Sequence, residues 1–404
     1  MRKISIISQF YPPDYAATGQ LIEELAQQLS QQDIAIQILT GQPAYGKKKQ
    51  QLAPREETKN KIHVLRSRTS RLWPLFLRGR AINGLLFCFR MALQLFQSRY
   101  RGDVLLLTTE PPYLLMIGYF AKKLFHLPYV CLLYDLYPDV AVSLDVIGEN
   151  HWLARFWNWL NQKIWQEAQG IIVLSSSMKK RILAKSPDIA NKIAVIHSWS
   201  DPNYITPKPK AENPFAIQHN LVETFTVLYS GNLGRCHDLD TIMATIWELK
   251  DDPIQFVFIG GGVKYDDGYQ KAMQEWGLRN CLFLPFQPKK DLPNSLTACD
   301  LSLVSIREGM EGLVAPSKLY GILAAARPVA AICEQNSYLC QILQEAGCGQ
   351  SFVHGDSEGL ANYIRLLATY PDKAQAMGQA GRNYLMTNYT PKVIAQKYAE
   401  VLLG

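Results

Sequence analysis

Short strand-like apolar runs alternate with helix-like stretches along the chain, and this alternation is the feature that most constrains the fold. In the first half such runs cover 3–8, 34–40, 103–109, 129–135, 170–176 and 192–198. Runs that are apolar at every position, such as 103–109, are typical of strands buried on both faces of a parallel sheet. Segments with helical spacing lie between them. The pattern predicts a doubly wound α/β fold.

A polar, proline-rich stretch interrupts the alternation near mid-chain. Residues 201–214 include four prolines, and the alternation restarts at 224–231. We therefore expect a linker at 201–214 between two Rossmann-like domains, residues 1–200 and 215–387. The last segment, about 388–404, is amphipathic, and we expect it to form a helix that packs back on the first domain.

Composition excludes several classes of protein. Of the 404 residues 48% are hydrophobic and 19% charged, which is typical of a folded chain and not of a disordered one. No apolar run is long enough to span a bilayer, and the N-terminus does not resemble a signal peptide. The eight cysteines form no C-x-x-C pair, so we expect reduced thiols in the cytoplasm and no structural zinc.

Positive charge is concentrated in the first half. Residues 1–200 carry 25 Lys and Arg against 14 Asp and Glu, and no acidic residue occurs in 59–101. This stretch mixes aromatic residues with cations, and the candidates for contact with an anionic membrane or an acceptor are Arg71, Trp73, Arg78 and Arg80. Two interpretations stay open: a helix at 81–98 lying in the membrane interface on the inner face of the plasma membrane, or a core helix with solvated arginines. No nucleic-acid-binding module is recognisable.

Glycine-containing turns follow strands in both halves, where ligands bind in open parallel sheets. In QFYPPDYAATGQ, Gly19 opens a helix. In SGNLGRCHDLDT, Gly231 and Asn232 directly follow a strand, and Gly234 and Arg235 come next. Glycines allow an anion to approach backbone N–H groups closely. The alternative interpretation is a plain connection between strand and helix.

A third turn is more specific. In GLVAPSKLYGILAAARPV, Pro316, Ser317 and Lys318 begin a helix rich in small residues. The hydroxyl, the free N–H groups and the ammonium can converge on a diphosphate. The alternative is helix capping with a solvated lysine.

Asp135 ends a buried strand and begins DLYPD. It is a candidate for positioning an acceptor hydroxyl or acting as its base. The alternative is that its carboxylate caps the next turn.

These segments, together with DVLLLTTEPPYLLMIGYFAKKL, GIIVLSSSMKKRI and FIGGG, occur in an order that resembles glycosyltransferase family 4, nearest to its colanic-acid-type (WbuB-like) branch. The resemblance implies a GT-B fold, with two Rossmann-like domains facing across a cleft. It also implies retaining transfer of a sugar from a UDP- or GDP-sugar to a glycan or lipid-linked acceptor in cell-surface polysaccharide or glycolipid synthesis. Neither a cofactor nor a metal is expected.

The resemblance also assigns roles to residues. It places the donor on Gly231, Asn232, Arg235, Gly261, Ser317, Lys318 and Leu319, with the Gly19 loop opposite. Glu308 or Glu311 is expected to contact the donor sugar. The chain departs from the family pattern at Gly321, where a second glutamate is usual, and at Asn232 and His237, where Arg and Lys are common. Two alternatives follow: a catalytically silent nucleotide-sugar-binding subunit, and a sugar-nucleotide 2-epimerase of the same fold.

Overall fold

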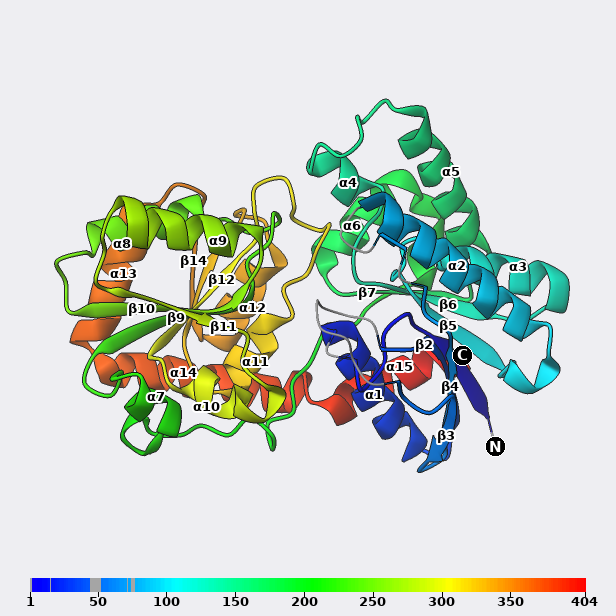
Figure 1. The fold of residues 1–404 in the computed structure, drawn as a ribbon, viewed down its shortest axis with the longest axis horizontal. Helices are drawn as coiled ribbons and strands as arrows, with labels where there is room; N and C mark the ends of the chain where they lie inside the picture. Colours follow the sequence, from blue (N-terminus) through cyan, green and yellow to red (C-terminus); the bar gives the residue numbers. More distant parts are fainter. Residues whose placement is uncertain (1, 15, 44–51, 71, 74–76) are drawn as a thin grey trace. The chain divides into compact units, whose positions relative to one another are not determined.

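The computed structural model describes residues 2–14, 16–43, 52–70, 72–73 and 77–404 and divides into two compact units (Figure 1). Unit 1 comprises residues 1–142, 147–197 and 391–404, and unit 2 comprises 143–146 and 198–390. Each unit contains one sheet with helices packed on it.

The sheet of unit 1 has the strand order β3-β4-β2-β1-β5-β6-β7-β8. Every neighbouring pair is parallel except β3 and β4. Ile6 of β1 lies between Ile38 and Leu106 in register, and all three are fully buried. The prediction of buried parallel strands is therefore confirmed. The strands are β1 Lys3–Ile7, β2 Ala35–Gly41, β3 Glu56–Lys59, β4 Ile62–Ser67, β5 Val104–Thr108, β6 Tyr129–Leu133, β7 Gly170–Val173 and β8 Ile193–Val195.

The β3–β4 hairpin was not predicted from the sequence. It occupies the start of the basic stretch, and Arg66 on β4 is buried there. The Arg66 guanidinium donates to the Glu57 carboxylate at 2.6 Å and to the Pro12 carbonyl oxygen at 2.7 Å. This arginine is consequently part of the core of unit 1 and not of a charged surface.

The helices of unit 1 cover both faces of its sheet. Helix α3 contacts both α2 and α5, and these three helices lie on one face of the sheet. Helices α1 and α15 contact each other on the opposite face. Right-handed crossovers require this division between the two faces. The helices are α1 Ala17–Ser30, α2 Leu77–Leu95, α3 Leu115–Phe125, α4 Asp139–Ser143, α5 Trp152–Glu167, α6 Ser176–Lys185 and α15 Pro391–Leu403. Among the residues that the structure describes, none of the helices has the length and apolar character needed to traverse a bilayer.

The sheet of unit 2 has the order β11-β10-β9-β12-β13-β14, and all neighbouring pairs are parallel. Its strands are β9 Phe225–Asn232, β10 Ile254–Gly261, β11 Cys281–Pro285, β12 Leu301–Ser305, β13 Val329–Ile332 and β14 Gly349–Phe352. Its helices are α7 Pro214–Gln218, α8 Asp240–Glu248, α9 Val263–Tyr269, the π-helix η4 Gln270–Glu275, α10 Leu292–Thr297, α11 Lys318–Ala324, α12 Tyr338–Ala346, α13 Ser357–Thr369 and α14 Pro371–Asn388. Two parallel α/β units are thus present, as predicted.

The proline-rich segment 201–214, predicted to be a linker, lies within unit 2. The Lys210 ammonium is 2.7 Å from the Asp300 carboxylate. The buried side chain of Asn213 donates to the Thr297 hydroxyl at 3.0 Å and accepts from the Phe215 N–H at 2.9 Å, which begins α7. These polar contacts explain how a proline-rich segment is held against a folded unit.

Helix α11 is held in place by α14. It ends at Ala324, and Ala326 beyond it adopts a left-handed conformation with φ 53°. Arg382 of α14 donates to the carbonyl oxygens of Ala324 and Ile205. A Cβ on Gly378 would lie 2.1 Å from the Ala326 carbonyl oxygen. Close packing of α14 therefore fixes the direction of α11, whose first residue is Lys318.

We expect Gly378→Ala to destabilise unit 2. Alanine favours a helix over glycine by about 1 kcal/mol, but overpacking against backbone costs about 1–3 kcal/mol. Thermal unfolding should therefore show a lower Tm than the wild type. Gln375→Ala, at an exposed position of the same helix, is the control and should not lower the Tm. An unchanged Tm for Gly378→Ala would contradict the packing described.

Candidate functional site

The carboxyl ends of β9 and β10 approach so closely that only glycine fits between them. A Cβ on Gly260 would lie 2.0 Å from the Gly231 carbonyl oxygen, and one on Gly262 would lie 2.6 Å from the Leu233 carbonyl oxygen. These three glycines have φ between 122° and 146°, which other residues rarely adopt. The Leu233 N–H donates to the Gly261 carbonyl oxygen at 2.8 Å. The two turns consequently form one fixed backbone edge.

Lys318 reaches this edge from the start of α11. Its Nζ lies 3.7 Å from the centroid of the Tyr229 ring and donates to the Tyr229 hydroxyl. Its Cε lies 3.6 Å from the Cβ position of Gly231. Burial lowers the pKa of the Lys318 ammonium to about 7.

No carboxylate in the described ranges forms an ion pair with Lys318. An ammonium removed from water without a counter-ion is costly, which is why its pKa falls. The position therefore favours an anionic ligand.

His237 lies beside Lys318. Its Nδ1 is 2.8 Å from the Ser305 carbonyl oxygen, and burial, followed by the charge of Lys318, lowers the pKa of the imidazole to about 3. The Lys264 ammonium donates to the His237 carbonyl oxygen at 2.8 Å. His237 is thus neutral at physiological pH and adds no positive charge to that of the two lysines.

The structure brings together some of the predicted donor residues. The Lys318 side chain lies next to the Cβ position of Gly231, Asn232 is the exposed last residue of β9, and Arg235 is exposed in the loop that follows. Ser317 is exposed at the N-cap of α11, and its side chain caps none of the helix N–H groups. The Ser317 hydroxyl is therefore accessible beside Lys318.

The prediction for Leu319 needs correction. Its side chain is fully buried, and its N–H donates to the Pro316 carbonyl oxygen at 3.4 Å. Neither group is available to a ligand in this conformation. Gly261 is half-buried, with its Cβ position 3.1 Å from the Phe286 ring.

The two candidate glutamates differ in accessibility. Glu308 is exposed in the loop after β12, whereas Glu311 is only 5% exposed and accepts from the Tyr338 N–H at 3.4 Å. Of the two, Glu308 is the one that solvent reaches. A Cβ on Gly321 would point toward Leu296, at 3.3 Å.

A second group of polar residues lies at the carboxyl edge of unit 1. Asp135 follows β6, and Glu110 follows the neighbouring strand β5. Burial, with the nearby negative charge of Glu110, raises the pKa of Asp135 to about 7. Burial also raises the pKa of Glu110. Two desolvated carboxyl groups that repel each other are suited to holding or exchanging a proton near neutral pH.

Glu110 and Thr18 were not predicted from the sequence. The Thr18 hydroxyl donates to the Glu110 carboxylate at 2.6 Å, and this bond connects the start of α1 to the end of β5. Gly19 is buried beside it, with its Cβ position 3.1 Å from the backbone of Tyr11. Gly19 therefore serves close packing of α1, and Thr18 is the residue that reaches the carboxyl pair. The available signal was the position of Glu110 directly after a buried strand.

The Asp135 main chain, and not its carboxylate, is involved in the local turn. Thr109 Oγ1 accepts from the N–H groups of Tyr134, at 3.1 Å, and Asp135, at 3.4 Å. The neighbouring Asp139 pairs instead with Lys185, at 2.6 Å. This leaves the Asp135 side chain at the edge of the sheet.

The predicted membrane or acceptor residues lie at and before the start of α2. Trp73 is 64% exposed, and Arg78 and Arg80 are exposed on the first turn of the helix. Arg71 lies outside the described residues. One face of α2 is core, as one interpretation held, but Phe89 on the other face is 62% exposed. No group of three or more His, Cys, Asp or Glu suited to a metal ion occurs within the described ranges.

Two family models together match most of the chain. The model described as "Glycosyl transferase 4-like domain" matches residues 17–199, and the one described as "Glycosyl transferases group 1" matches residues 212–384. The first match falls on unit 1 and the second on unit 2.

Several known proteins are similar to this chain. The probable glycosyltransferase WbjE of Pseudomonas aeruginosa is 27% identical over 80% of each chain. The putative colanic acid biosynthesis glycosyl transferase WcaI of Escherichia coli is 35% identical over 29% of each chain. The structure of Anabaena HepE in complex with UDP and glucose covers 100% of both chains, with a TM-score of 0.73 and 14% identity.

The matches agree with the geometry of both units. The structural similarity shows the GT-B fold. One family model covers the sheet of unit 1, and the other covers the sheet of unit 2. The chain belongs to the family 4 type of glycosyltransferases, and one of its relatives, WcaI, is described as a putative colanic acid biosynthesis enzyme.

Proposed function

We propose that this glycosyltransferase moves a sugar, with retention of configuration and without a metal ion, from a UDP- or GDP-sugar to a glycan or lipid-linked acceptor. The transfer serves cell-surface polysaccharide or glycolipid synthesis. The protein acts in the cytoplasm, in peripheral contact with an anionic membrane through Arg78, Arg80 and Trp73.

The observation that carries this proposal is the ammonium of Lys318 without a counter-ion. A diphosphate supplies two or more negative charges, and its departure from a sugar builds up further charge. Lys318, the Ser317 hydroxyl and the exposed turn after β9 lie where such a group would be neutralised. That HepE has been solved with UDP-glucose supports a uridine nucleotide as the first donor to try.

Acceptor activation is assigned to unit 1. Asp135 has a pKa near 7, so it is partly ionised at neutral pH and able to accept a hydroxyl proton. Glu110 raises that pKa, and the Thr18 hydroxyl holds Glu110 in place. On the donor side, Glu308 is the exposed candidate for contact with the sugar.

A donor screen tests the proposal. UDP or GDP at 100-fold excess over its Kd should stabilise the protein by about 2.7 kcal/mol, seen as a rise in Tm. Incubation with the donor sugar and an acceptor in EDTA should yield a product of unchanged anomeric configuration by NMR. No shift with any nucleoside diphosphate would refute donor binding. Epimerised donor without an acceptor would favour the epimerase, and binding without turnover would favour the silent subunit.

Replacing Lys318 tests the diphosphate site. Binding of a diphosphate should raise the Lys318 pKa from about 7 toward its ordinary value. At pH 8 the wild type should consequently take up roughly one proton per UDP bound, and below pH 6 almost none. Titration calorimetry in buffers of different ionisation enthalpy measures this uptake. Lys318→Met should lose the uptake and bind UDP at least about tenfold more weakly.

The stability of the same variant separates function from folding. The folded-state pKa of Lys318 is below the unfolded value, so this group binds more protons in the unfolded chain, and its contribution to wild-type stability rises with pH above 7. Lys318→Met should weaken this rise without lowering the Tm at pH 6. Lys290→Met, at an exposed lysine of unit 2, is the control. Proton uptake that persists in Lys318→Met would overturn the assignment.

Replacing Glu110 tests the acceptor site. If Asp135 acts as the base, kcat/KM should rise with pH around 7. Glu110→Gln removes a negative charge that raises the Asp135 pKa, so the rise should move to lower pH. Asp135→Asn should reduce activity by about 10²–10⁴-fold.

The matched control is Glu149→Gln, at an exposed carboxyl of unit 1, which should leave the pH profile unchanged. If Glu110→Gln abolishes the pH dependence instead of shifting it, Glu110 is the base and the assignment to Asp135 is wrong.

A further inference from the structure

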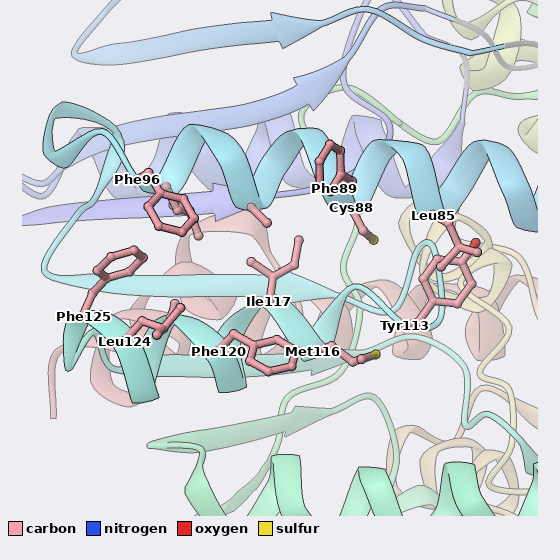
Figure 2. Close-up of a pocket in the computed structure, with 13 residues that line it drawn as sticks. Leu85, Cys88, Phe89, Phe96, Tyr113, Met116, Ile117, Phe120, Leu124 and Phe125 are labelled. Carbon is pink, nitrogen blue, oxygen red and sulfur yellow. The ribbon is translucent and has the colours of Figure 1, made fainter.

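An apolar groove of about 260 Å³ lies between α2 and α3 in unit 1 (Figure 2). One wall is formed by Leu85 and Phe89 of α2 and by Phe96, which directly follows this helix, and the other by Met116, Phe120 and Leu124 of α3. The side chains of Phe89, Phe120 and Leu124 are 62%, 52% and 61% exposed. The groove is therefore an open slot in the surface and not a cavity inside the core.

The core of unit 1 does not require these side chains. The opposite face of α2 supplies the core residues Phe87 and Met91, which are both buried. A surface helix normally carries a single apolar stripe, whereas α2 is apolar on two faces. Apolar side chains gathered at an exposed slot indicate a binding surface.

The lining indicates an occupant without polar groups. Among the described lining residues, Tyr113 alone carries a side-chain oxygen or nitrogen, and its hydroxyl already donates to the Ala81 carbonyl oxygen. A peptide segment would leave its own N–H and C=O groups unpaired in such a slot, at a cost that a hydrocarbon chain does not incur.

The two ends of the groove differ. At one end the Phe96 and Phe125 rings meet edge to face, with centroids 5.3 Å apart, and the Arg101 guanidinium lies 3.7 Å from the centroid of the Phe125 ring. Leu85 and Tyr113 lie at the other end (Figure 2). Tyr113 follows Glu110 by only three residues, so this end leads toward the carboxyl edge that holds Asp135.

The aromatic end also carries a cation, but the Arg101 guanidinium already donates to the carbonyl oxygens of Leu95, at 2.6 Å, and Phe96, at 2.9 Å. Two further arginines stand at the end that leads to the carboxyl edge. Arg80 precedes Leu85 by five residues, about 7.5 Å along the helix axis, and Arg78 lies half a turn earlier. Both are exposed. An occupant with a hydrocarbon tail in the groove and a phosphate at its head would match both the apolar lining and these arginines.

We propose that the α2–α3 groove binds the hydrocarbon chain of a lipid-linked acceptor, with the phosphate at Arg78 and Arg80 and the accepting hydroxyl directed toward Asp135. This inference rests on the proposed function and names the acceptor class for it. The tail enters from the Leu85 and Tyr113 end, and the aromatic pair at the other end limits how far it reaches.

The test uses n-alkyl phosphates below their critical micelle concentrations, measured by titration calorimetry with the full chain. Affinity should rise about fourfold for each added methylene between hexyl and dodecyl phosphate, until the groove is filled. Ala92→Trp fills the groove from α2 and should weaken dodecyl phosphate binding at least tenfold. Leu93→Trp, at an exposed neighbour that does not line the groove, is the matched control and should bind like the wild type.

Other results would overturn the inference. Affinity independent of chain length, or equal competition by inorganic phosphate, would mean that only the head group is recognised. Equal binding of all variants to phosphatidylglycerol vesicles, without binding of alkyl phosphates, would indicate a surface for a bilayer. A dimer seen by light scattering that Ala92→Trp dissociates would make the groove an interface between copies.

The UDP-induced rise in Tm, measured in the same variants, keeps the two proposals apart. Ala92→Trp should retain it. If no variant responds to UDP while alkyl phosphates still bind, the proposed function fails and the groove assignment stands without it.

Discussion

The ammonium of Lys318 is the group on which the proposed chemistry of unit 2 depends. It is held over the Tyr229 ring and against Gly231, at an edge that side chains on Gly260 or Gly262 would block. Its direction is set from a distance, because Arg382 and Gly378 of α14 fix the far end of α11. The packing of α14 against α11 therefore sets the position of the Lys318 ammonium. An anionic ligand would compensate the free-energy cost of removing this charge from water.

In both units burial shifts the pKa of an ionisable group toward neutrality, downward for a lysine in unit 2 and upward for an aspartate in unit 1. Each unit concentrates ionisable groups where parallel strands end, the usual ligand-binding edge of such sheets. In unit 2, burial lowers the pKa of Lys318 to about 7, and in unit 1, burial and Glu110 raise that of Asp135 to about 7. A group that is partly charged at neutral pH responds strongly to a ligand. The cationic edge suits a leaving diphosphate, and the acidic edge suits a hydroxyl that must give up a proton.

The sequence was sufficient for the fold because buried parallel strands are apolar at nearly every position, and a second series of them predicts a second sheet. It was sufficient to expect Gly231 and Lys318 at the same edge of the sheet, because Gly231 lies at the end of a strand and Lys318 begins a helix. It was not sufficient for Glu110, whose importance comes from burial and from its proximity to Asp135 on the next strand. Leu319 was misassigned because adjacency to Lys318 says nothing about the direction of its side chain, which faces the core.

The basic stretch shows why local sequence left two interpretations open. Arg66 and Phe89 belong to one run of cationic and aromatic residues, yet Arg66 is buried in a strand and Phe89 is largely exposed on a helix. Membrane surface and protein core both select aromatic side chains, so composition cannot separate them. The structure distinguishes these two environments through α3, a helix that is not part of the basic stretch. Only when Phe120 and Leu124 lie opposite α2 does the exposed face of that helix become one wall of a groove, with a direction that leads to the carboxyl pair.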